Sequence, residues 1–117
     1  MQLGELVTHI GAEVIVPGAS PAAPVCRVYG GDKISELLAA ADEETLLVTN
    51  LSNAAVVHVA ALMDAPGICL TGRDAVGPDL VAAAERHGKA LFLTVADMAE
   101  TCARAAACLA GSKTEEL

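Results

Sequence analysis

The fold follows from one stretch of the sequence, Thr45-Leu46-Leu47-Val48-Thr49-Asn50-Leu51-Ser52-Asn53-Ala54-Ala55-Val56-Val57. A short apolar run ends in a threonine, a small polar loop follows, and a helix-like apolar segment continues to Met63. A short apolar run bounded by polar residues predicts a buried strand, and the apolar segment after the loop predicts a helix. The stretch therefore predicts one strand–loop–helix unit.

The same unit occurs twice more towards the C-terminus. Ile68-Cys69-Leu70-Thr71 precedes Gly72-Arg73-Asp74 and a helix predicted from Pro78 to His87, with Gly88 after it. Leu91-Phe92-Leu93-Thr94 precedes a helix predicted over about residues 96–109. Because parallel strands must be joined by crossovers, usually helices, the three units predict a parallel sheet with its polar strand ends along one edge.

The residues before Thr45 add further predicted elements: a helix over 3–10, a strand over 12–16, a strand over 25–29 and a helix over 33–41. Gly11 is expected to cap the C-terminus of the helix over 3–10, and Asp32 is expected to cap the N-terminus of the helix over 33–41. Together the elements predict an α/β fold, in which a single three-layer domain has a mostly parallel sheet of about five strands flanked by helices.

A chain of 117 residues is long enough for one hydrophobic core. We expect one domain over residues 1–111 and a disordered polar tail over 112–117. Hydrophobic residues make up 54% of the chain, yet no apolar run approaches the roughly 20 residues of a membrane-spanning helix. This excess of apolar residues in a small domain instead suggests surface buried against a second copy or a neighbouring domain, and we expect a homodimer.

The formal net charge of −8 argues against nucleic acid as a partner, because phosphate binding requires a basic face. The first residues, Met1 to Glu5, show no basic region before an apolar one, so we expect no signal peptide and a cytoplasmic location. We expect no membrane association either.

No pattern of residues argues for catalysis, a metal or a cofactor. The four cysteines form no Cys-x-x-Cys pair and no Cys/His pair at ligand spacing, and we interpret them as reduced structural thiols. There is no Ser/His/Asp order, no nucleophile elbow and no pair of carboxylates in an apolar setting. We therefore predict no catalytic residue and no bound cofactor.

The edge that carries Thr49, Thr71 and Thr94 is the candidate site. Open α/β sheets bind ligands at the carboxyl ends of their strands, beside helix N-termini that suit anions. The competing interpretation is local capping, since Thr is a good strand former and Asp, Asn and Ser are ordinary cap residues. The candidate ligand-binding residues are Gly31, Asp32, Ser35, Thr49, Asn50, Ser52, Asn53, Thr71, Gly72 and Arg73.

Two further features have a structural and a functional interpretation. The segment Gly30-Gly31-Asp32 follows a predicted strand and opens a helix, as phosphate-binding loops do. It lacks the Gly-x-x-x-x-Gly-Lys-Ser/Thr spacing of such loops, so a tight bend is the favoured interpretation. The helix over 53–63 is apolar nearly all round, which predicts burial on more than one side, in the core or against a second copy. His58 within it is expected in the core or in an interface.

Several segments of the chain resemble the DRTGG domain family. They are Val28-Tyr29-Gly30-Gly31-Asp32-Lys33-Ile34-Ser35, Leu47-Val48-Thr49, Asn53-Ala54-Ala55-Val56-Val57, Ala65-Pro66-Gly67-Ile68-Cys69-Leu70-Thr71-Gly72 and Gly88-Lys89-Ala90-Leu91-Phe92-Leu93-Thr94. The resemblance covers about residues 2–109. The Asp-Arg-Thr-Gly-Gly string that names the family is absent, and only Arg27 and Gly30-Gly31 come near it.

The resemblance implies an α/β regulatory module with no established catalytic residues. Such domains occur beside CBS domains in inorganic pyrophosphatases and within phosphotransacetylases, and they are similar to the N-terminal domain of HPr kinase/phosphorylase. We accordingly expect a non-catalytic regulatory domain that self-associates and senses a small anionic or nucleotide-like ligand. The alternative is a protein-interaction scaffold for a partner enzyme, without a ligand.

Overall fold

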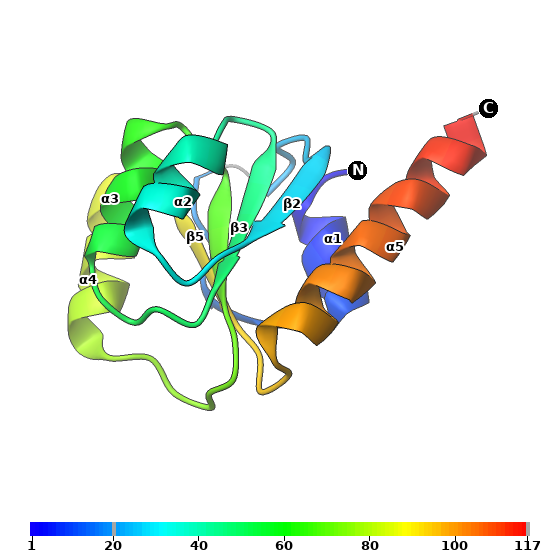
Figure 1. The fold of residues 1–117 in the computed structure, drawn as a ribbon. Coiled ribbons are helices and arrows are strands. Elements are labelled where there is room, and N and C mark those ends of the chain that lie inside the picture. Colours follow the sequence, from blue (N-terminus) through cyan, green and yellow to red (C-terminus); the bar gives the residue numbers. More distant parts are fainter. Residues whose placement is uncertain (20, 117) are drawn as a thin grey trace.

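The computed structural model describes residues 1–19 and 21–116, with the backbone alone described for 112–116. The elements, drawn in Figure 1, are α1 (Leu3–Ile10), β1 (Glu13–Val16), β2 (Arg27–Gly30), α2 (Ile34–Ala40), β3 (Thr45–Thr49), α3 (Ala55–Leu62), β4 (Gly67–Leu70), α4 (Pro78–His87), β5 (Ala90–Leu93) and α5 (Met98–Glu116). No helix among these residues is long and apolar enough to cross a membrane.

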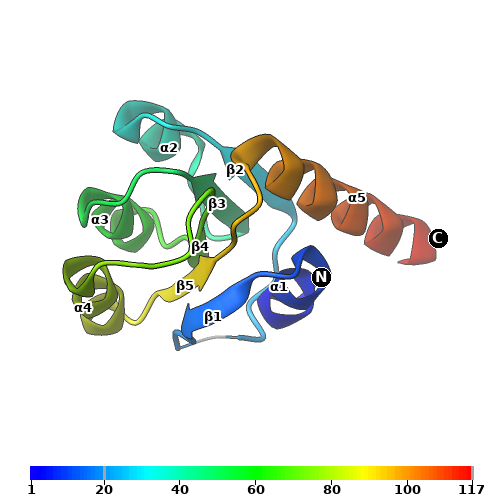
Figure 2. The same cartoon turned by 90° about the horizontal axis from the view of Figure 1, so that it is seen from below.

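The sheet has the strand order β1-β5-β4-β3-β2. Strands β2 to β5 are parallel to their neighbours, whereas β1 pairs antiparallel with β5 at one edge. Helices α2, α3 and α4 cover one face of the sheet, and α1 and α5 cover the other (Figures 1 and 2). The predicted α/β fold with three layers and a mostly parallel sheet of five strands is confirmed.

Both faces of the sheet are buried, which explains why its central strands are continuously apolar rather than alternating. Along β3, Leu47 packs into the core beneath α2, α3 and α4, while Leu46 and Val48 pack beneath α1 and α5. The strand is buried from Thr45 to Thr49. Strand β3 therefore lies between the two cores and contributes side chains to both.

Two predicted helix ends differ from the structure. Lys33, not Asp32, occupies the N-cap position of α2, and no side chain caps that helix. The backbone of α5 is helical to Glu116, beyond the end expected near Leu109. The disordered tail expected over 112–117 falls on residues whose side chains, and at Leu117 also the backbone, lie outside the described part of the structure.

The apolar helix α3 lies between α2 and α4 in one layer (Figure 2). Its residues Val56, Val57, Val59 and Ala60 are buried within this one chain, so the core accounts for the apolar character that also suggested an interface. His58 is exposed in the single chain, so it does not lie in the core as one of its two interpretations expected, and its place in an interface stays a prediction. Leu62, at the end of the helix, is 72% exposed.

Candidate functional site at the carboxyl edge of the sheet

The loops that follow β2, β3, β4 and β5 lie at the same edge of the sheet because these strands are parallel. They are at the lower end of Figure 1, and Figure 2 looks onto them. The chain leaves β4 towards α4 on one face and leaves β5 towards α5 on the other face. In open α/β sheets, ligands bind where neighbouring loops diverge in this way.

Thr49 and Thr94 use their hydroxyls to shape their own loops. The Thr49 Oγ1 accepts a hydrogen bond from the backbone N–H of Leu51 at 3.1 Å, and the Thr94 Oγ1 accepts one from the N–H of Ala96 at 3.2 Å. Each hydrogen bond closes a local side-chain-to-backbone turn, which gives both the hydroxyl oxygen and the backbone N–H a partner. For these two threonines, local capping therefore explains the residue type.

Thr71 differs from both. It is 1% exposed, and its Oγ1 has no hydrogen-bond partner among the described residues. The buried Nε of Arg73, two residues further along the same loop, also lacks a partner there. Leaving a buried polar group unpaired costs roughly 1–3 kcal/mol of stability. Two such atoms in one loop therefore mark a place where the described protein atoms do not complete the hydrogen bonding.

Hydrogen bonds between neighbouring loops hold this segment in place. The backbone N–H of Thr71 donates to Thr49 O at 3.0 Å, and that of Gly72 donates to Ala96 O at 2.8 Å. The Arg73 Nη2 donates to Asn50 O at 2.8 Å, which fixes the guanidinium against the β3–α3 loop. Gly72 has a φ of 70°, a conformation that favours glycine.

The structure therefore brings part of the predicted ligand-binding set together. The residues joined by these contacts are Thr49, Asn50, Thr71, Gly72 and Arg73. The other members lie in the β2–α2 and β3–α3 loops and the starts of their helices: Gly31, Asp32, Ser35, Ser52 and Asn53. The Asn53 Oδ1 accepts a hydrogen bond from Ala55 N at 2.9 Å, which forms a local side-chain-to-backbone turn just before α3.

The glycines after β2 are explained by close packing. A Cβ on Gly30 would lie 2.5 Å from the Cys102 Sγ of α5, and one on Gly31 would lie 3.0 Å from Cε2 of Tyr29. Glycine is required at both positions because a side chain would collide with α5 or with the preceding tyrosine. These contacts support the tight-bend interpretation of Gly30-Gly31-Asp32.

An open cleft of ≈ 280 Å³ adjoins Arg73 on the same edge. Its lining residues are Gly11, Glu13, Arg73, Asp74, Leu93, Thr94 and Val95. Glu13 enters the cleft because β1 pairs with β5, and nothing in the sequence pattern signals that pairing. The cleft combines one guanidinium with two carboxylates, those of Glu13 and Asp74.

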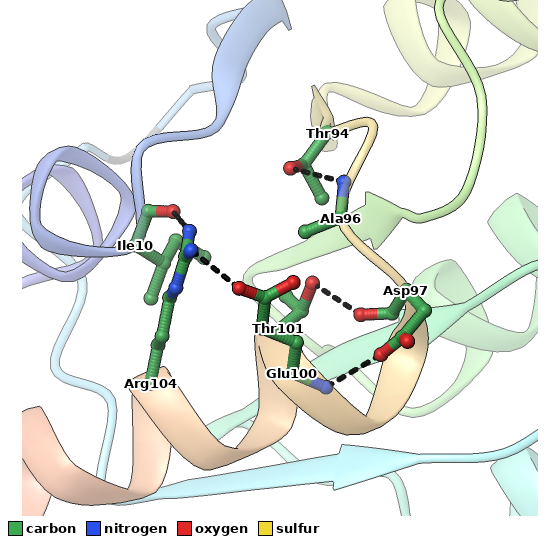
Figure 3. Close-up of polar contacts among 7 residues, drawn as sticks. All are labelled: Ile10, Thr94, Ala96, Asp97, Glu100, Thr101 and Arg104. Carbon is green, nitrogen blue, oxygen red and sulfur yellow. Dashed lines mark hydrogen bonds and ion pairs between the residues drawn. The ribbon is translucent and has the colours of Figure 1, made fainter.

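The start of α5 satisfies its own polar groups (Figure 3). The Asp97 Oδ1 accepts a hydrogen bond from the backbone N–H of Glu100 at 2.7 Å, and Thr101 Oγ1 donates to Asp97 O at 2.8 Å. Arg104 donates to Glu100 Oε1 at 2.6 Å and to Ile10 O at 3.4 Å, which ties α5 to α1. This helix start needs no ligand.

Metal or thiol chemistry has no support at this edge. Across the described ranges, no group of three or more His, Cys, Asp or Glu side chains is placed to hold a metal ion. The four cysteines are free. Burial raises the pKa of the Cys69 thiol to about 12, with a smaller contribution from Cys102 beside it, so Cys69 stays a protonated core side chain at neutral pH.

Neither a protein-family model nor a curated protein matches this sequence. Among solved structures, the chain is similar to the CBS and DRTGG domains of the regulatory region of a Clostridium perfringens pyrophosphatase, crystallised with its activator diadenosine tetraphosphate. The TM-score is 0.70 at 12% sequence identity, over 89% of this chain and 45% of that chain. At this identity the likeness is one of fold, and it supports the DRTGG-like fold that the sequence resemblance implies.

Proposed function

We propose that this chain is a non-catalytic regulatory domain that binds a small anionic or nucleotide-like ligand at the loop of Thr71 to Arg73. The observation that carries the proposal is the pair of buried, unpartnered polar atoms in this loop, the Oγ1 of Thr71 and the Nε of Arg73. A ligand oxygen that reached the loop after a small side-chain movement would satisfy donors for which the described protein atoms provide no acceptor.

The chemistry of the edge favours a nucleotide over a free inorganic anion. The guanidinium of Arg73 presents its donors in a planar fork that matches phosphate oxygens. The carboxylates of Glu13 and Asp74 line the same cleft, and they would repel a bare anion but accept hydrogen bonds from sugar hydroxyls or base amino groups. The remaining predicted residues on the neighbouring loops, including Ser52 and Asp32, would contact the outer part of such a ligand.

The likeness in fold gives a second line of support. The pyrophosphatase region with which this chain shares its fold is a regulatory region bound to a dinucleotide activator. This chain spans 45% of that protein's chain, so a comparable role here is part of the proposal.

Self-association into a homodimer completes the proposal. Large apolar side chains remain on the surface of the single chain, with Leu62 72%, Val95 75% and Val14 53% exposed. Light scattering on the purified protein at several concentrations tests this half, and a strictly monomeric species would remove it. A scaffold that pairs with a partner enzyme without a ligand is the alternative function.

A thermal-shift screen tests the proposed ligand binding. AMP, ADP, ATP, diadenosine tetraphosphate and inorganic phosphate are added separately to the wild-type protein and to Arg73→Ala. We expect at least one nucleotide to raise the midpoint of the wild type, because a ligand that binds only the folded state stabilises it. Arg73→Ala should lose that rise, whereas Arg86→Ala, which changes an exposed arginine of α4, should keep it. No shift with any ligand at millimolar concentration would leave the scaffold as the better account.

A further inference from the structure

The imidazole rings of His58 and His87 contact each other edge to face on the outer surface of the helical layer. Their centroids are 5.5 Å apart and their planes meet at 79°. His58 comes from the middle of α3, His87 is the last residue of α4, and both are exposed. Because α4 runs back from the carboxyl edge, His87 lies towards the opposite edge of the sheet from Thr71.

This spacing matches two imidazoles that share one metal ion. A zinc–imidazole bond of about 2.1 Å places the ring centre roughly 3.2 Å from the metal, so two rings at a tetrahedral angle have centres roughly 5.2 Å apart. The observed 5.5 Å is close to that value. Rotation about the side-chain bonds of two exposed residues is sufficient to aim one nitrogen of each ring at a common point.

We infer that His58 and His87 form a binding site for a borderline divalent transition metal ion, such as Ni²⁺, Cu²⁺ or Zn²⁺, with water in the remaining positions. Imidazole is a preferred ligand for these metals, and the formal charge of −8 favours a cation at the surface. The packing of α3 against α4 keeps the backbones of the two histidines close together before a metal arrives. The inference is independent of the ligand proposed at Thr71.

Titration with NiCl₂, followed by calorimetry and by the NMR signals of the three histidine rings, tests the site. Bound Ni²⁺ is paramagnetic, so the ring signals of His58 and His87 should broaden at concentrations that leave those of His9 sharp. His58→Ala and His87→Ala should each weaken binding at least tenfold, and His9→Ala, which removes an exposed histidine of α1, should leave it unchanged.

The variants remain interpretable because both histidines are exposed and their removal leaves the core intact. Amide spectra of each variant without metal check that the fold is retained. Equal broadening of all three histidines, or Ni²⁺ binding that survives both substitutions, would show that the rings merely touch and would overturn the inference.

Discussion

Thr49 and Thr71 end neighbouring strands and are both buried, yet their hydroxyls are in opposite situations. The Thr49 Oγ1 accepts a hydrogen bond from Leu51 N at 3.1 Å, whereas the Thr71 Oγ1 has no partner among the described residues. The sequence pattern identified both residues as strand ends but gave no means of telling them apart. The difference depends on which backbone groups each loop turns towards the hydroxyl, and that follows only from the folded loops.

The two threonines therefore predict stability changes of opposite sign. Thr71→Val removes an unpaired buried hydroxyl at nearly constant shape and should raise the free energy of unfolding by up to about 1 kcal/mol. Thr49→Val leaves the N–H of Leu51 unpaired and should lower it by about 1 kcal/mol. Urea unfolding followed by circular dichroism measures both. If Thr71→Val destabilised the domain as much as Thr49→Val does, the Thr71 hydroxyl would have a partner within the protein.

Asp42 predicts a dependence of stability on pH. Its carboxylate accepts hydrogen bonds from Thr45 Oγ1 at 2.7 Å, from Glu44 N at 2.9 Å and from Arg27 Nη2 at 2.7 Å. The hydrogen bond from Thr45, followed by the others, holds the pKa of Asp42 below its ordinary value. Because the pKa is lower in the folded state, the ionised carboxylate stabilises the protein at pH values above the unfolded pKa of about 3.9. This stabilisation is lost as the pH falls through the folded pKa.

Asp42→Asn should therefore lose less stability than the wild type between pH 5 and pH 3. Urea midpoints at several pH values measure the two slopes. Parallel curves for the wild type and Asp42→Asn would show that the hydrogen bonds of Asp42 do not bias its ionisation.

At the scale of the elements, the β2–α2 bend shows how α5 limits the sequence. Gly30 ends β2 where α5 crosses it, and a Cβ there would lie 2.5 Å from the Cys102 Sγ and 3.3 Å from the Met98 Cγ. The two glycines suggested a bend from the sequence, whereas the crossing helix became visible only in the fold. A phosphate loop would need glycine for the approach of a ligand, but here the approaching group is a side chain of the protein.

Gly30→Ala should destabilise the domain by about 1–3 kcal/mol because overpacking forces Cys102 or α5 to move. Adding Cys102→Ala to Gly30→Ala should recover part of that loss beyond the sum of the single changes, since it removes the nearest atom. Gly4→Ala, at an exposed position within α1 with an ordinary 3.5 Å contact to Pro21 O, should instead stabilise by roughly 0.5–1 kcal/mol. An additive double variant would point to backbone strain instead.

Local patterns predicted the strand–helix units, and long-range contacts determined the rest. The helix from Pro78 to His87 begins and ends as expected, with Gly88 in the left-handed conformation just after it. By contrast, Asp32 was expected to cap α2, but its backbone lies one residue before the cap position. Glu13 reached the candidate cleft only because β1 pairs antiparallel with β5, and such pairings depend on contacts distant in sequence.

For the whole molecule, the three-layer fold separates its two proposed sites, with one at the carboxyl edge of the sheet and the other on the outer surface of α3 and α4. The carboxyl edge carries the unpartnered Thr71 and Arg73, and the far end of α4 carries His87 beside His58. The shared fold with a pyrophosphatase regulatory region extends over 89% of this chain, so the comparison concerns the domain as a whole and not one motif. The proposed regulatory function depends on ligand binding at the carboxyl edge.

Mapping of backbone amides by two-dimensional NMR, during titration with diadenosine tetraphosphate, tests that claim most directly. We expect the signals of Asn50 and of Thr71, Gly72 and Arg73 to shift in a saturable manner, while those of α1 do not move. The same titration of Arg73→Ala should show no saturable shift at this loop. Spectra that stay unchanged at millimolar ligand, or shifts centred on Gly88 and Lys89 at the opposite edge, would rule out a binding site at the loop of Thr71 to Arg73.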